Sequence, residues 1–309
     1  MKWLISILIL LNAIFFFSCE EDEITHEPPV TEIDELKDSA CYIVQVLDYQ
    51  YAPGQYATNT ALTNSEYFVG KPHYLYTVYP DNPKSAVSLG GFGGYIIGKF
   101  NHTIPNLEGN DLIVFCGNSP AAEPGIVSVM EDTNGNGLPD DTWYELSGSA
   151  HNHSETYTQY QITYYKPALN ENITWKDNKG NSDTLRVGFG STTSYAWWPD
   201  NTKDSLLFTG TRLPDAYYNN STGTTESWVV YPNRFNYGYA ENNAAGDYNE
   251  TKKGNEFDIA NARDSVGNPV TLSGIRFIKI HTAVLQQAGW LNEISTEVYG
   301  AADLRMLNE

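Results

Sequence analysis

The order of apolar and polar positions along the chain predicts short β-strands and no long helix. Runs rich in β-branched and aromatic residues alternate with turn signals such as those at 178–181 and 267–269. No stretch of a dozen residues keeps a helical period. This pattern favours an all-β fold. The predicted strands are residues 41–49, 95–100, 111–117, 125–130, 160–165, 226–231, 275–283 and 293–300.

The segment IRFIKI, at 275–280, is apolar on both sides of an extended strand, because successive side chains point to opposite faces. One side carries Ile275, Phe277 and Lys279. The other side carries Arg276, Ile278 and Ile280. A strand of this kind is covered on both faces, so we expect it at the centre of a sheet. We therefore predict a single β-sandwich, jelly-roll or galactose-binding-like, with long loops.

The first forty residues have a different pattern. Residues 1–18 combine a basic start, an apolar run and a small residue before Cys19, which is typical of a lipoprotein signal whose cysteine is acylated. An ordinary secretory signal and an anchor helix are the alternatives, but the apolar run is short for a membrane span. Residues 19–40 are acidic and contain proline, which predicts a flexible tether. The sandwich is then expected over 41–303, with a C-terminal tail over 304–309.

The composition supports a folded domain and limits its partners. The chain has 309 residues, of which 41% are hydrophobic and 13% aromatic, so it can bury a sizeable core. It has 18 Lys and Arg residues against 38 Asp and Glu residues, which gives a net charge of −20. This charge argues against nucleic acid as a partner and suits cations or neutral ligands. The sequence leaves open whether Cys41 and Cys116 pair.

The segment DTNGNGLPDD, at 132–141, places oxygen-bearing side chains at alternate positions around glycine, which is what calcium needs from a short loop. Trp143 stands where an EF-hand would have its bidentate glutamate, so the segment resembles the shorter loops of dockerins and thrombospondin-type repeats. A polar turn without an ion is the alternative. Three crowded carboxylates favour a structural calcium ion. Its expected ligands are Asp132, Asn134, Asn136, the Leu138 carbonyl, Asp140, Asp141 and Glu145.

Two further groups of residues are candidates for ligand binding. Aromatic side chains in loop-like surroundings can stack on sugar rings, although core packing is the alternative for each of them. Separated carboxylates can converge into an acid pair such as glycosidases require. The aromatic candidates are Trp197, Trp198, Tyr217 and Tyr218. The carboxylate candidates are Glu123, Asp258, Glu293 and Glu297. His151 and His153 can share a metal or lie in a solvated loop, and no nucleophile-elbow, zinc-protease, P-loop or dinucleotide motif is present.

An ordered set of motifs runs through most of the chain, including GGFGGYIIGKF at 90–100, AEPGIVSVMEDTNGNGLPDDTWYELSGS at 122–149 and FDIANARDSVGNPVTLSGIRFIKIHTA at 257–283. This set resembles a family of Bacteroidetes surface lipoproteins usually labelled cell surface protein or PKD-domain-containing protein. The resemblance implies a β-sandwich binding protein on the outer face of the outer membrane. Because some members are encoded near cobalamin-uptake systems, it also implies capture of a corrinoid or a glycan.

We therefore expect a non-catalytic surface lipoprotein that captures a nutrient, a glycan or a corrinoid, and passes it to an outer-membrane transporter. A glycan-active hydrolase with an acidic residue pair is the alternative from a different class. An adhesive or structural surface protein is the third reading. In each case the lipid on Cys19 attaches the protein to the outer membrane.

Overall fold

The computed structural model describes residues 40–75, 84–117, 122–169, 171–186, 197–242, 246–289 and 292–307. The expected signal peptide, Cys19 and nearly all of the expected tether lie outside these residues. Within them the fold is all-β, as predicted, and the connections contain only short 3₁₀ turns. No helix of the described part is long and apolar enough to cross a membrane. The 3₁₀ turns are η1 (Ser65–Phe68), η2 (His73–Leu75) and η4 (Ile259–Asn261).

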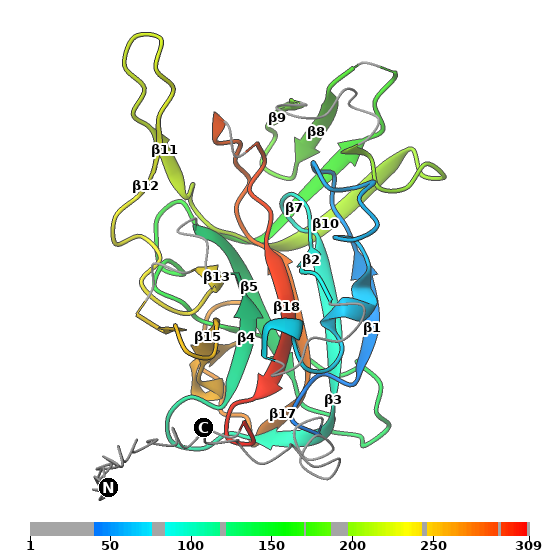
Figure 1. Ribbon diagram of the computed structural model, residues 1–309, viewed down its shortest axis with the longest axis vertical. Coiled ribbons are helices and arrows are strands. Elements are labelled where there is room, and N and C mark those ends of the chain that lie inside the picture. Colours follow the sequence, from blue (N-terminus) through cyan, green and yellow to red (C-terminus); the bar gives the residue numbers. More distant parts are fainter. Residues whose placement is uncertain are drawn as a thin grey trace, which may run out of the picture.

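Two antiparallel sheets form the sandwich (Figure 1). The larger contains β1 (Gln45–Gln50), β3 (Tyr95–Pro105), β5 (Ala122–Met130), β6 (Tyr144–Leu146), β13 (Ala240–Asn242), β16 (Ala262–Arg263) and β17 (Gly274–Thr282). The smaller contains β2 (Val87–Ser88), β4 (Leu112–Cys116), β14 (Tyr248–Asn249), β15 (Gly254–Phe257) and β18 (Glu297–Asp303). Their facing side chains, such as Ile96, Val127 and Ile278 from the first and Val114 and Val298 from the second, pack in one core cluster.

Strand β17 lies between β3 and β5, which confirms its predicted central position. The predicted division of its side chains is wrong at one point. A bulge between Ile275 and Phe277 shifts the alternation, so Ile275 joins Ile278 and Ile280 in the core. Lys279 faces away from that core, on the outer side of the sheet.

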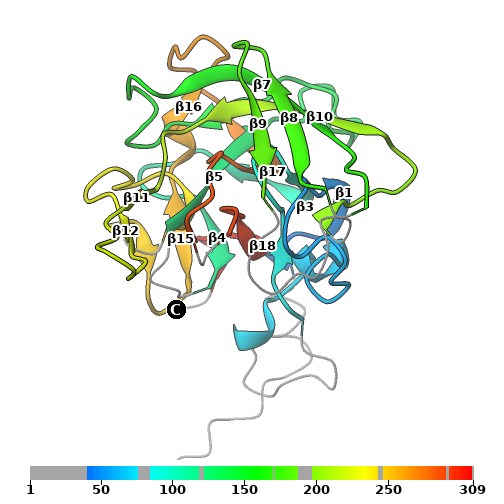
Figure 2. The ribbon, with the colours of Figure 1, turned by 90° about the horizontal axis from the view of Figure 1, so that it is seen from above.

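A second layer packs on the larger sheet at its upper end in Figure 1. It consists of a four-stranded sheet and a two-stranded hairpin. Figure 2 shows the four-stranded sheet above the sandwich and the hairpin to one side of it. The sheet contains β7 (Tyr157–Tyr165), β8 (Ile173–Asp177), β9 (Ser182–Leu185) and β10 (Ser205–Arg212), and the hairpin contains β11 (Tyr217–Asn219) and β12 (Trp228–Val230).

The strand directions give the sandwich two different ends. The connection between β17 and β18 rises between the hairpin and the four-stranded sheet at the upper end (Figure 1). The turn between β5 and β6 lies at the lower end, because Met130 pairs with Phe277 near the start of β17. The beginning of the described chain is also at the lower end, where the Asp303 amide donates to the Cys41 carbonyl at 2.8 Å. Cys41 and Cys116 are both buried thiols.

Candidate functional site

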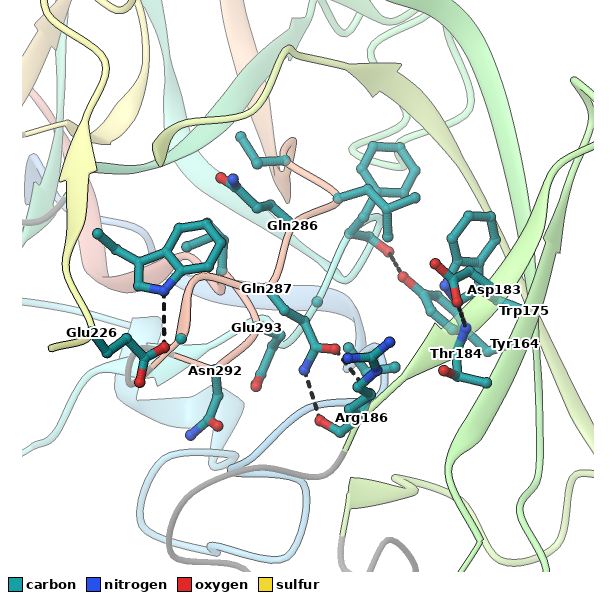
Figure 3. A pocket seen from close by; sticks show the side chains of 18 residues that line it. Tyr164, Trp175, Asp183, Thr184, Arg186, Glu226, Gln286, Gln287, Asn292 and Glu293 are labelled. Atoms are coloured by element: carbon teal, nitrogen blue, oxygen red, sulfur yellow. Dashed lines mark hydrogen bonds between the residues drawn. The ribbon is translucent and has the colours of Figure 1, made fainter. Parts of the chain in front are cut away.

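The candidate functional site is a groove at the upper end, between the four-stranded sheet and the hairpin. It encloses a cavity of about 480 Å³. Its aromatic walls include Phe92 and Tyr164, which are buried, and Trp175 and Trp228, which are half-buried. In Figure 3, Trp175 and Asp183 lie on the side of the sheet, Glu226 on the side of the hairpin, and Gln287, Asn292 and Glu293 between them.

Two neighbouring glutamines fix the walls of the groove. Gln286 accepts hydrogen bonds from the backbone amides of Ala216 and Tyr217 at 2.9 and 3.0 Å and donates to the Tyr217 carbonyl at 2.6 Å. Gln287 binds both the amide and the carbonyl of Arg186, at 2.8 and 2.7 Å (Figure 3). The connection between β17 and β18 therefore holds the hairpin on one side and the end of the four-stranded sheet on the other.

Trp228 has a fixed orientation in this wall. Its Nε1 donates to Glu226 Oε1 at 2.9 Å. Its ring packs against Gly289, where a Cβ would lie 2.2 Å from Nε1 and where φ is +54°. Only glycine fits both the close approach and the backbone conformation. The indole is therefore held in place before any ligand binds.

Glu293 places an unsatisfied oxygen at the groove. Its Oε1 accepts a hydrogen bond from the Gln55 amide at 2.6 Å, whereas its Oε2 is buried and has no hydrogen-bond partner. A Cβ at Gly54 would lie 2.4 Å from Oε1, so the glycine is needed for this approach. Burial raises the pKa of Glu293 well above its ordinary value, and the nearby Glu297 adds to the rise. A buried polar atom without a partner at a cavity is a natural contact for a ligand.

The groove continues into a more open depression beside the hairpin, with a volume of about 620 Å³. The two share Trp175, Trp228 and Gln286. Here Tyr218 and Tyr231 are half-buried, and their ring centres are 5.0 Å apart. Partly exposed rings line the groove along much of its length, so it suits an extended ligand with flat apolar faces.

The predicted aromatic candidates divide into two groups. Tyr217 and Tyr218 line the depression, although Tyr217 is mostly buried and its hydroxyl accepts from the Ala122 amide at 2.9 Å. Trp197 and Trp198 do not line the groove. Both are buried in the cluster beneath the four-stranded sheet, and Trp198 Nε1 donates to the Asp200 carbonyl at 2.7 Å. The structure therefore gives these two tryptophans a packing role in place of the predicted ligand contact.

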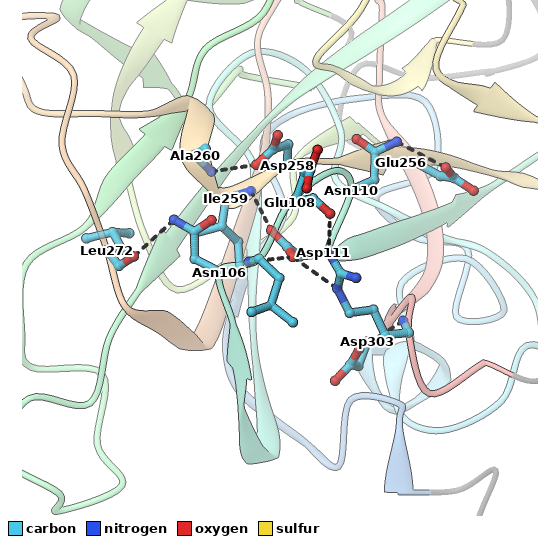
Figure 4. Close-up of polar contacts among 12 residues, drawn as sticks. Asn106, Glu108, Asn110, Asp111, Glu256, Asp258, Ile259, Ala260, Leu272 and Asp303 are labelled. Atoms are coloured by element: carbon cyan, nitrogen blue, oxygen red, sulfur yellow. Dashed lines mark hydrogen bonds and ion pairs between the residues drawn. The ribbon is translucent and has the colours of Figure 1, made fainter.

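Three of the four predicted carboxylates meet at the upper end, next to the groove. They are joined by Glu241, which the sequence did not single out, and together they form the four-glutamate cluster of Glu123, Glu241, Glu293 and Glu297. Asp258 lies apart. At the lower end it caps η4 by accepting from the Ala260 amide at 2.7 Å, close to Asp111 (Figure 4).

Hydrogen bonds hold the carboxyl groups of this cluster in position. Glu123 Oε2 accepts from the Ser295 amide at 2.9 Å, and Glu297 Oε1 accepts from the hydroxyls of Ser88 and Ser295 at 2.7 and 2.6 Å. Glu241 Oε2 accepts from the Glu297 amide. Within the described residues none of the four forms an ion pair with Lys, Arg or His.

Burial and mutual repulsion act in the same direction on the cluster. Burial is the main cause that raises the pKa of Glu123, Glu241 and Glu297, and the charge of Glu297 raises the pKa of the first two further. Where carboxyl groups share a site, at least one of them loses its proton at a higher pH than an isolated carboxyl group. Such a group can supply both a protonated acid and a carboxylate base, which is the chemistry of an acid pair.

The predicted calcium-binding turn lies at the lower end, away from the groove. Its polar side chains hydrogen-bond one another: Asp140 accepts from the amide groups of Asn134 and Asn136 at 3.1 and 2.9 Å, and Asp141 accepts from the Thr133 amide at 3.1 Å. Asn136 Oδ1 accepts from the Leu138 amide at 2.7 Å. The described residues contain no group of three or more His, Cys, Asp or Glu arranged to hold a metal ion.

Cationic side chains also approach this turn. Arg276 Nη1 lies 3.6 Å from Asp132 Oδ2, and Lys99 Nζ donates to the Gly137 carbonyl at 2.8 Å. These two cations reduce the repulsion that favoured an ion in the sequence. Asp132 Oδ1 is nevertheless buried without a partner, so it is the oxygen that fits a bound cation. The calcium ion stays a prediction, with Asp132 as its best-placed ligand.

Chelation tests the calcium prediction. We expect EDTA to lower the melting temperature and excess calcium to restore it. Calcium at about 100 times its Kd should raise the free energy of unfolding by about 2.7 kcal/mol. Asp132→Ala should abolish the response. Asp264→Ala removes a similar turn-capping aspartate at 264–268 and should leave the response intact. Melting curves that are identical with and without chelator would contradict the prediction.

Glu145, the last expected calcium ligand, lies away from the turn. It is on β6, where its Oε2 accepts from Thr211 Oγ1 at 2.7 Å and lies 3.5 Å from His151 Nε2. The structure thus separates Glu145 from the other predicted ligands. His151 and His153 also point to different partners, since His153 Nδ1 lies 4.0 Å from Glu155 Oε2.

A comparison of the chain with protein-family models and with curated proteins gives no match. The functional argument therefore rests on the groove and on the four-glutamate cluster.

Proposed function

We propose that the protein is a lipid-anchored cell-surface protein that binds a glycan in the groove without cleaving it. In this proposal Cys19 carries the lipid, the host membrane is an outer membrane of the Bacteroidetes type, and the captured sugar passes to an outer-membrane transporter. A calcium ion in the turn at 132–141 would stiffen the lower end. The single observation that carries the proposal is the pairing of half-buried aromatic faces with an unpartnered buried carboxyl oxygen in one cavity.

The chemistry of the groove favours a neutral sugar over other ligands. The apolar face of a sugar ring packs on an aromatic ring, and Trp175 and Trp228 are each partly exposed. A sugar hydroxyl can donate or accept, so it can satisfy Glu293 Oε2 whether or not the carboxyl is protonated. The groove and its open continuation, of about 480 and 620 Å³, also have room for more than one sugar unit.

Binding of neutral oligosaccharides tests this proposal. We expect affinity electrophoresis or calorimetry to detect binding, and Trp228→Ala to weaken it at least about tenfold, which is about 1.4 kcal/mol. Tyr237→Ala removes an exposed aromatic ring outside the groove and serves as the matched control. Unchanged affinity in Trp228→Ala would exclude the groove as the site. A screen in which only cobamides bind would replace the glycan by a corrinoid, and a screen without any ligand would favour an adhesive role.

A second candidate function is favoured by the four-glutamate cluster. Its gathered carboxyl groups, next to the groove, suit a glycan hydrolase with an acid pair. Such an enzyme should release reducing ends from oligosaccharides and lose this activity in Glu297→Gln or Glu123→Gln. A binding protein should leave the same oligosaccharides intact. Reducing-end assays on the unmodified protein therefore separate the two candidates.

A further inference from the structure

A second cavity lies on the outer side of the larger sheet, where β7 and β10 cover it. Its volume is about 220 Å³, and its walls include Ser128, Glu145, Arg263, Lys279 and His281. Contacts between the layers close it: Thr211 on β10 hydrogen-bonds Glu145, and Gly210 packs against the His281 ring. The cavity is separate from the groove, and the two share no lining residue.

Strand register places four of these side chains in one row. Lys279 on β17 pairs with Ser128 on β5, Ser128 pairs with Glu145 on β6, and Glu145 pairs with Arg263 on β16. Directly opposed residues of antiparallel strands share a face of the sheet. Neighbouring strands are about 4.8 Å apart, so the row carries a cation, a hydroxyl, a carboxylate and a second cation over about 14 Å.

Most of the carboxylate oxygens in this cavity already accept hydrogen bonds from the protein. Glu145 Oε2 accepts from Thr211, and Asp264 accepts from the amides of Val266 and Asn268 and from the Asn268 side chain. Hydrogen bonds to the protein therefore occupy both oxygens of Asp264 and one oxygen of Glu145, whose Oε1 can still accept from a hydroxyl group of a ligand.

The donors, in contrast, are largely unused. Within the described residues Lys279 Nζ makes no hydrogen bond and contacts only the Tyr95 ring, at 4.5 Å from its centre. Arg263 donates from Nη1 to the Ala262 carbonyl at 2.8 Å, which leaves most of its N–H groups available. Burial lowers the pKa of His281 to about 4, so this ring is neutral at neutral pH. The cavity thus offers two cationic donors beside one free oxygen of Glu145, in a chain whose net charge is −20.

We propose that this cavity binds a compact hydroxy-carboxylate, with Lys279 and Arg263 holding the anion. A planar guanidinium matches a carboxylate with two parallel hydrogen bonds, and a lysine ammonium adds a point charge. Ser128 and Glu145 lie between the two cations in the row, and both suit hydroxyl groups of the same ligand. A cavity of about 220 Å³ has room for several water molecules, so it can hold one acidic sugar unit. This inference does not rest on the proposed function of the groove.

Calorimetry with D-glucuronate, and with D-glucose as its neutral counterpart, tests this site on the purified protein. We expect glucuronate to bind, and any binding of glucose, which belongs to the groove, to be unchanged by substitutions in this cavity. Lys279→Met and Arg263→Gln should each weaken glucuronate binding by at least about tenfold, because each removes charge-assisted hydrogen bonds. Trp228→Ala should leave it unchanged, which separates failure of this site from failure of the groove.

Two outcomes would overturn the proposal: absence of glucuronate binding at millimolar concentration, and glucuronate affinity that survives in both neutralising variants. Arg263 lies on the two-residue edge strand β16 and is half-buried, so its replacement is the safer one for folding. Arg263→Lys keeps the charge and loses the planar fork. This variant should bind glucuronate with an affinity between those of the unmodified protein and Arg263→Gln. Equal loss in both Arg263 variants would show that the planar guanidinium, and not its charge, holds the ligand.

Discussion

Replacing Asp111 with alanine is expected to lower the free energy of unfolding by about 3 kcal/mol, because it leaves the partners of a buried charge unpaired. Asp111 is fully buried at the lower end of the sandwich. Its Oδ1 accepts from the Leu107 amide at 3.1 Å and from Arg305 Nε and Nη2 at 3.3 and 3.2 Å. Its Oδ2 accepts from the Ile259 amide at 3.1 Å (Figure 4). One carboxylate thus joins three segments that are far apart in sequence.

Thermal melts measure this effect. A loss of about 3 kcal/mol corresponds to a fall of about 6 to 12 °C in a domain of this size. Asp258→Ala is the matched control, because Asp258 is nearby and also accepts a backbone amide, but it is more exposed and caps only a short turn. That variant should lose about 1 kcal/mol or less. Equal losses in the two variants would show that Asp111 is not the buried junction described above.

The four-glutamate cluster is expected to make the protein less stable at about pH 8 than at about pH 6.5, the reverse of ordinary acid denaturation. The pKa of each of its carboxyl groups is raised in the folded state, first by burial. In this range the folded chain therefore binds more protons than the unfolded chain, so stability falls as the pH rises. The slope is about 1.4 kcal/mol per pH unit for each extra proton that the folded state holds.

The choice of pH range isolates this effect. The pKa of His281 is lowered to about 4 by burial, so its opposite contribution to the slope fades above about pH 6.5, where unfolded histidine loses its proton. Exposed carboxylates with a lowered pKa, such as Asp140 and Asp264, act only at lower pH still. Among the described residues, the carboxyl groups with a raised pKa that can act between about pH 6.5 and pH 8 are those of the cluster and of the partly buried Asp215 and Asp247.

Glu241→Gln tests the assignment to the cluster. The amide keeps the size of the side chain and an acceptor for the Glu297 amide, but it cannot ionise. We expect this variant to melt higher than the unmodified protein at about pH 8 and to depend less on pH. Glu171→Gln, on the exposed connection between β7 and β8, should leave the pH dependence as it is. A stability that is flat in the unmodified protein over this range would refute the explanation.

The all-β fold class can be predicted from features that are local in sequence. The second layer of the fold cannot. IRFIKI has apolar residues on both sides, and it forms the central strand β17. Strands β8, β9 and β10 were not predicted, because each keeps an exposed polar side and their apolar alternation is weak. The bulge beside Ile275 depends on pairing with β3, so the sequence of β17 alone does not indicate it.

The candidate site was only partly predictable for similar reasons. The sequence suggested that Glu123, Glu293 and Glu297 can converge. In the structure, strand pairing brings these three residues together. Glu241 lies in the three-residue strand β13 with a φ of +52°, and no local pattern distinguishes it. The capping role of Asp258 had a signal, since aspartate is a preferred residue before a helical turn. The row from Lys279 to Arg263 needs three long-range strand pairings, which no short segment encodes.

The position of Cys41 beside Asp303 affects how a lipid-anchored molecule would be oriented relative to the membrane. Cys41 lies at the lower end, next to Asp303, whereas the groove lies at the upper end, beside the connection between β17 and β18. If the lipid and the glycan site of the proposed function are both correct, the sandwich lies between the groove and the point where the described chain begins. The length of the sandwich would then act as a spacer that keeps the groove clear of neighbouring lipid headgroups.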